Sequence, residues 1–151
     1  SRYLPAVISR EIDEHAAREK PFSLLLLRPP HLGEVGLHET ADAKDVYLQK
    51  CSASILSTIR PSDHLFRYHE DQFLIIYVEA NLDAANALAL RVQTAIHQEV
   101  ILRAFHTPGF GVSVGIAEFD GHPDPADLLR RAEIALVDAI QSGDSDAIMH
   151  A

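Results

Sequence analysis

Apolar and polar residues follow two different periods along this chain, one typical of helices and one typical of strands. Apolar positions three and four residues apart predict amphipathic helices, whereas short and almost wholly apolar runs predict buried strands. The helical pattern covers residues 1–20, 41–59, 83–100 and 125–141, and the strand pattern covers residues 22–27, 65–68, 73–78, 110–116 and 147–149. Residues 101–110 are ambiguous and could hold a short edge strand. This order predicts one α/β sandwich with a central, mostly antiparallel sheet flanked by helices.

Prolines, an acidic residue and a glycine mark where several of these elements begin or end. Pro21 ends the first helix, because proline lacks the backbone donor that a helix needs. Asp124 is the expected N-cap of the last helix, with Pro125 in its first position and Gly143 closing it. Large apolar residues occupy every second position of residues 110–116, which predicts a strand with one face packed more deeply than the other.

The most informative stretch is the predicted hairpin of residues 65–78. Its two apolar runs flank four polar residues, His69-Glu70-Asp71-Gln72, which we expect to form a turn at the edge of the sheet. The second run is apolar throughout, so we expect that strand to be buried on both faces. Arg60 and Asp63 form an R-x-x-D pair just before the first strand of the hairpin.

Composition excludes several classes of function. The formal net charge of −9 argues against nucleic-acid binding, which needs a basic surface. The single cysteine, Cys51, excludes an internal disulfide and favours a reducing, cytoplasmic location. No apolar run approaches the roughly 20 residues of a membrane span, so we expect no membrane contact. The 151 residues begin without methionine, and we interpret residues 1–151 as one domain excised from a larger, multidomain protein.

The hairpin resembles the signature of a known family, the GGDEF domains of diguanylate cyclases. That signature reads approximately D-x-x-x-R-Y-G-G-D-E-F, and this chain has Asp63 followed by Arg67-Tyr68-His69-Glu70-Asp71-Gln72-Phe73. Further stretches resemble the family in the same order: residues 22–32, the S-V-G-I-A run of residues 113–117, the L-L-R-R-A-E-I-A-L run of residues 128–136, and Gly143. The resemblance covers nearly the whole chain and implies the GGDEF fold.

The same resemblance implies changes at the catalytic positions. In the family, an acidic residue at the end of the first strand and an acidic pair in the hairpin bind the metal ion; here these positions hold Arg28, Asp71 and Gln72. His69 and Glu70 replace the two glycines. The family's guanine-binding and phosphate-binding positions hold Gly36, Ile140 and Asp144. We therefore expect a degenerate domain without enzymatic activity, in which Arg28 pairs with Asp71 where the metal would lie.

The residue types of a second site of the family are present in this sequence. The R-x-x-D pair resembles the product-inhibition site for cyclic di-GMP, in which the arginine donates two hydrogen bonds to guanine and the aspartate accepts from the base. Arg60 and Asp63 occupy these positions, and Arg91 occupies that of a reinforcing arginine on the next helix. A purely structural role is the alternative, with Asp63 capping a strand and Arg60 complementing a helix end.

These observations leave three hypotheses. The first is an inactive regulatory module that binds cyclic di-GMP and signals to attached domains or a partner protein, with homodimerisation possible. The second is a protein-interaction or dimerisation module that binds no nucleotide, and the third is a GTP-sensing regulator of an attached phosphodiesterase. The spacing of the nine histidines matches no metal-ligand motif, so we expect no metal and no cofactor.

Overall fold

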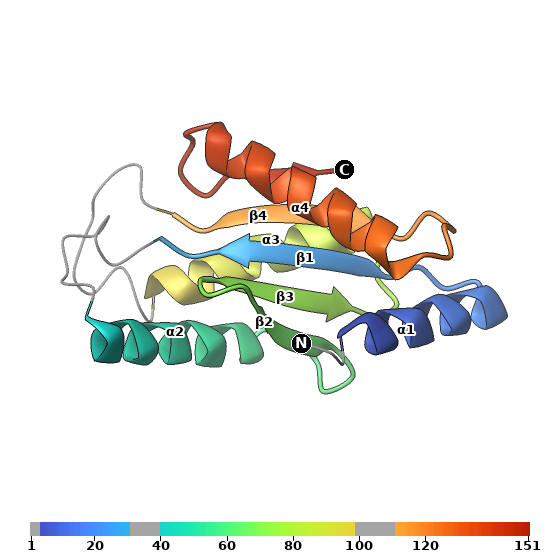
Figure 1. The fold of residues 1–151 in the computed structure, drawn as a ribbon, viewed down its shortest axis with the longest axis horizontal. Coiled ribbons are helices and arrows are strands. Elements are labelled where there is room, and N and C mark those ends of the chain that lie inside the picture. Colours follow the sequence, from blue (N-terminus) through green and yellow to red (C-terminus); the bar gives the residue numbers. More distant parts are fainter. Residues whose placement is uncertain (1–3, 31–39, 99–110) are drawn as a thin grey trace.

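A computed structural model of the chain describes residues 4–30, 40–98 and 111–151 (Figure 1). The elements are α1 (Leu4–Arg18), β1 (Ser23–Arg28), α2 (Ala41–Leu56), β2 (His64–Tyr68), β3 (Gln72–Tyr77), α3 (Leu82–Ile96), β4 (Ser113–Glu118), α4 (Pro125–Gln141) and β5 (Ile148–His150). They match the predicted elements to within a few residues. The edge strand considered for residues 101–110 lies outside the described residues.

The five strands form one sheet in the order β2-β3-β1-β4-β5. β1 lies in the middle and pairs antiparallel with both β3 and β4, with Leu25 opposite Ile75 on one side and Ile116 on the other. β2 and β3 form the predicted antiparallel hairpin, and the pairing of β4 with β5 is parallel. The predicted α/β sandwich with a mostly antiparallel sheet is therefore confirmed.

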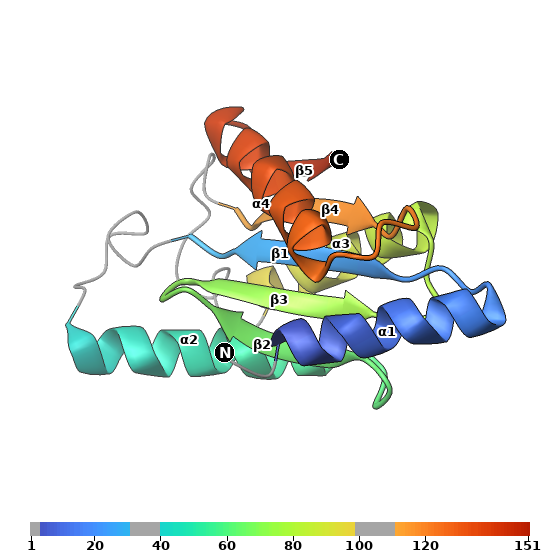
Figure 2. The ribbon, with the colours of Figure 1, turned by 45° about the vertical axis from the view of Figure 1, so that its right-hand side comes forward.

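Helices cover both faces of the sheet, with α1 and α4 on one face and α2 and α3 on the other (Figures 1 and 2). Alternate residues of β1 point to opposite faces, so Leu24 packs with the α1/α4 layer and Leu25 packs with the α2/α3 layer. The side chains of β3 from Phe73 to Ile76 are fully buried, as predicted for a strand covered on both faces.

Polar caps begin three of the helices. The side chains of Thr40, Asn81 and Asp124 each accept a hydrogen bond from a backbone amide in the first turn of α2, α3 and α4. Asp124 was predicted in this role. At the other end of α4, Gly143 has a φ of 74°, the left-handed conformation in which glycine is favoured after a helix.

The prediction that β4 packs more deeply on one face is wrong, because both of its faces are buried. The face carrying small residues is covered by α4, which approaches very closely. A Cβ atom added to Gly115 would lie 2.2 Å from the backbone nitrogen of Leu136 and 2.6 Å from the carbonyl oxygen of Ala132. Small side chains therefore allow close helix–sheet contact here rather than marking an open surface. None of the helices in the described residues has the length and hydropathy needed to cross a bilayer.

Candidate functional site

The signature positions of the hairpin gather at one edge of the sheet. β1 ends at Arg28 and β3 begins at Gln72. Leu27 pairs with Phe73 across the two strands, so Arg28 and Gln72, one position further on, lie next to each other. His69, Glu70 and Asp71 form the connecting turn. His69 has a φ of 53°, a left-handed conformation that is uncommon for residues other than glycine.

Side chains from both helical layers hold this turn. Lys44 of α2 lies 3.5 Å from a carboxylate oxygen of Glu70, and Arg67 donates a 2.7 Å hydrogen bond to the Glu70 carbonyl oxygen. On the opposite face, the Tyr68 hydroxyl donates a 2.6 Å hydrogen bond to Glu133 of α4. Burial, together with this hydrogen bond to a carboxylate, raises the pKa of Tyr68 to about 12. The turn is thus attached to the helices on both sides of the sheet.

Arg28 and Asp71 are half-buried at this edge, and each takes part in polar interactions. Their expected pairing with one another stays a prediction. Among residues 4–30, 40–98 and 111–151, no group of three or more histidine, cysteine or acidic side chains is arranged to hold a metal ion. Gly36, at the guanine-binding position, lies outside the described residues.

The R-x-x-D loop lies at the opposite end of the hairpin, between α2 and β2. The Asp63 side chain is 0% exposed, and its carboxylate accepts four hydrogen bonds. Oδ2 accepts from the backbone amide of Arg60 at 2.8 Å and from its Nε at 3.1 Å. Oδ1 accepts from Nη2 of Arg60 at 2.9 Å and from the backbone amide of Val78 at 3.1 Å. These donors fill the capacity of the carboxylate, so a base reaches it only by displacing one of them.

The guanidinium of Arg60 is held on several sides. Besides its contacts with Asp63, Nη2 donates to the carbonyl oxygen of Val78, and the guanidinium carbon lies 4.7 Å from the centre of the Tyr77 ring. The hydrogen bonds that Arg60 donates to the Asp63 carboxylate raise the pKa of Arg60, which stays charged. Among the described residues, Arg60 donates hydrogen bonds from its backbone amide, Nε and Nη2. To donate two hydrogen bonds to a guanine from Nη1 and Nη2, Arg60 must therefore break the hydrogen bond between Nη2 and the Val78 carbonyl oxygen.

Arg91 reaches the same place from α3. Its Nη2 lies 3.5 Å from the Tyr77 hydroxyl, so Tyr77 lies between the two arginines. The three residues predicted to bind the ligand, Arg60, Asp63 and Arg91, thus come together from two segments far apart in the sequence. Sequence reasoning missed Tyr77, because the last residue of an apolar strand is expected to be a core position.

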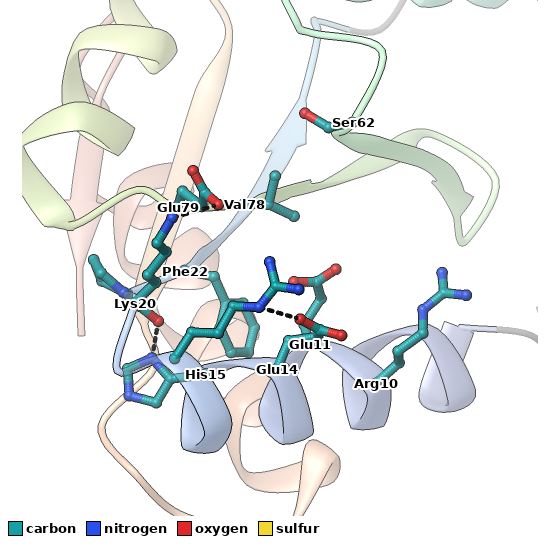
Figure 3. A pocket seen from close by; sticks show the side chains of 11 residues that line it. Arg10, Glu11, Glu14, His15, Lys20, Phe22, Ser62, Val78 and Glu79 are labelled. Carbon is teal, nitrogen blue, oxygen red and sulfur yellow. Dashed lines mark hydrogen bonds and ion pairs between the residues drawn. The ribbon is translucent and has the colours of Figure 1, made fainter.

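A cavity of about 290 Å³ lies on the other side of this loop, between α1 and the end of β3 (Figure 3). Ser62, Val78 and Glu79 line it together with the second half of α1 and the segment that follows. Several of its charges are paired, including Lys20 with Glu79 at 3.1 Å. Oε1 of Glu11 lies 3.8 Å from Nε2 of His64 on β2. Burial raises the pKa of Glu11.

Comparison with known proteins identifies the family. Residues 1–146 match the family model described as "Diguanylate cyclase, GGDEF domain". The chain is a GGDEF domain. This GGDEF domain is 29% identical over 143 residues to the diguanylate cyclase DosC of Escherichia coli, covering 94% of the chain and 31% of the relative. It is 33% identical over 107 residues to the diguanylate cyclase DgcS of Shewanella oneidensis, covering 66% of the chain and 35% of that relative.

Solved structures have the same fold. The diguanylate cyclase SiaD of Pseudomonas aeruginosa, solved in complex with its activator SiaC, superposes with a TM-score of 0.84 at 22% identity, covering 99% of this chain and 57% of that one. DgcB of Caulobacter crescentus, solved as coiled coil and GGDEF domain with c-di-GMP, has a TM-score of 0.81 at 16% identity, covering 97% of this chain and 78% of that one.

These comparisons correct one expectation from the sequence. The prediction of a domain without enzymatic activity is wrong, because the matched family and the curated relatives are named as diguanylate cyclases. That prediction rested on single positions, among them Arg28, His69 and Gln72, whereas family membership rests on a pattern across 146 residues. The turn also carries the carboxylates of Glu70 and Asp71, which are oxygen donors of the kind divalent cations accept.

Proposed function

We propose that this GGDEF domain binds cyclic di-GMP at a site formed by Arg60, Asp63 and Arg91 and that it serves in cyclic di-GMP signalling. The observation that carries the proposal is that two arginines from separate segments contact Tyr77, Arg60 at its ring and Arg91 at its hydroxyl. Two cations that contact the same tyrosine suit a ligand with two phosphates and two guanines, because guanidinium groups donate to both. Asp63 orients Arg60 through its bidentate contact.

The described contacts also support a route for signalling to attached or partner domains. Val78 binds Asp63 through its amide and Arg60 through its carbonyl oxygen. The next residue, Glu79, pairs with Lys20, which follows α1, and the amide of Ala80 donates to the Pro21 carbonyl oxygen at 2.9 Å. Ligand contact with Arg60 therefore acts on a segment that is bonded directly to the end of the N-terminal helix.

Calorimetric titration of cyclic di-GMP into the purified domain tests the proposal. We expect saturable binding to the wild type and its loss in Arg60→Ala and in Arg91→Ala. Arg130→Ala is the matched control, because Arg130 is an exposed arginine on α4 that pairs only with Asp127 among the described residues. Melting temperatures measured alongside separate loss of binding from loss of fold.

A wild-type domain without affinity for cyclic di-GMP at micromolar concentration refutes the proposal and favours a nucleotide-free interaction module instead. Equal binding by wild type and Arg60→Ala refutes the assignment of the site. GTP with magnesium is titrated in parallel, and its conversion is followed by chromatography, because the relatives carry the name of diguanylate cyclases.

A further inference from the structure

We propose that Tyr77 is a positioning residue of this site, whose ring holds the Arg60 guanidinium and whose hydroxyl lies beside Arg91; this inference rests on the proposed function. Tyr77 is the last residue of β3, and its ring belongs to the face of the sheet that α2 and α3 cover. Arg60 follows α2 and Arg91 lies on α3. Tyr77 contacts both guanidinium groups.

The ring and the hydroxyl of Tyr77 contact different arginines. The Arg60 guanidinium carbon lies 4.7 Å above the ring, within the range of cation–π attraction, so the ring restrains that plane. The hydroxyl lies 3.5 Å from Nη2 of Arg91, at the outer limit of a hydrogen bond. The ring contact is therefore the stronger of the two, and the hydroxyl mainly limits where Arg91 lies.

The other contacts of Arg60 explain why a restraint on the plane matters. Asp63 holds Nε and Nη2 along one edge of the guanidinium, and Nη2 also donates to the Val78 carbonyl oxygen. When Nη2 leaves Val78 to contact a base, the edge contact with Asp63 by itself leaves rotation about that edge possible. Cation–π contact with the Tyr77 ring opposes this rotation. The remaining nitrogen, Nη1, is thereby aimed in one direction before ligand arrives, which reduces the ordering cost of binding.

Two substitutions separate the ring from the hydroxyl. Tyr77→Phe keeps the ring, and we expect a dissociation constant for cyclic di-GMP within about twofold of the wild type. Tyr77→Leu keeps apolar volume against the core but removes the aromatic face, and we expect binding at least about fivefold weaker. Tyr77→Met replaces Tyr77→Leu if the latter fails to fold, because methionine adapts to irregular core space.

A double-mutant cycle distinguishes positioning from general destabilisation. Lysine cannot stack as a planar guanidinium does, so the effect of Tyr77→Leu on affinity is expected to shrink in an Arg60→Lys background. Equal affinity of wild type and Tyr77→Leu, or the same loss in both backgrounds, overturns the role of Tyr77 while cyclic di-GMP binding itself stands. A wild type that binds no cyclic di-GMP overturns both proposals.

Discussion

Replacement of Asp63 by alanine tests whether this carboxylate organises the loop before β2. The side chain is 0% exposed and accepts four hydrogen bonds, two from the backbone amides of Arg60 and Val78 and two from the Arg60 guanidinium. Removing it leaves all four donors without that acceptor. The Arg60 side chain is 45% exposed, so water replaces most of what the guanidinium loses. The cost therefore falls mainly on the two backbone amides.

Each partly buried donor left without an acceptor costs about 1–3 kcal/mol, so two of them predict a loss of about 2–6 kcal/mol in the free energy of unfolding. In a domain of this size each kcal/mol lowers the melting temperature by about 2–4 °C, so that loss corresponds to roughly 4–24 °C. Urea unfolding followed by circular dichroism measures it directly. The midpoint is expected to fall while the slope with urea stays constant, since the native surface is unchanged.

Asp127→Ala is the matched control for this measurement. Asp127 also pairs with an arginine three residues away, at 2.7 Å, but the Arg130 side chain is 67% exposed and the Asp127 side chain is 16% exposed, so water reaches both partners of this pair on α4. A surface pair of this kind contributes about 0–1 kcal/mol. If Asp63→Ala costs no more than Asp127→Ala, the buried carboxylate does not organise the loop, and the four hydrogen bonds are not a stabilising unit.

Three further predictions concern other parts of the fold. Gly115→Ala is expected to destabilise by about 1–3 kcal/mol or more, because the added methyl group meets the backbone of α4; urea unfolding measures it. Tyr68→Phe is expected to remove the tyrosine that ionises near pH 12 in a spectrophotometric titration, since Tyr68 donates to Glu133. Burial raises the pKa of Glu11 in the folded state, so its contribution to stability is present at low pH and is lost as pH rises through that pKa. Glu11→Gln is expected to flatten the fall in unfolding free energy over that pH range.

Each of these predictions has an outcome that contradicts it. Unchanged stability of Gly115→Ala means that α4 moves away without cost. A late-ionising tyrosine that persists in Tyr68→Phe assigns that pKa to another residue. For Glu11, a wild-type stability that rises relative to Glu11→Gln as pH increases means that attraction by His64 outweighs burial, which is the reverse of the order expected.

The fold was predictable because its signals are local. The apolar run of β3, the cap at Asp124 and the glycine after α4 each follow from a few adjacent residues, and all three occur as predicted. The helix expected over residues 83–100 is α-helical to Ile96 and continues as π-helix through His97 and Gln98, the last described residues of that segment. The burial of the second face of β4 was not predicted, because a small residue such as Gly115 occurs in a strand both where it faces solvent and where a helix packs closely against it.

For the candidate site, the sequence by itself suggested Arg60, Asp63 and Arg91, because their residue types and spacing match the family. Only the tertiary structure revealed that Asp63 is saturated by donors and that Tyr77 lies between the arginines. The physical reason is distance along the chain. Val78 and Asp63 are separated by 15 residues, and their contact exists because β3 returns beside β2 and ends at the loop. Periodicity reports which face of an element is buried, whereas contacts between the ends of different elements depend on how the whole chain folds.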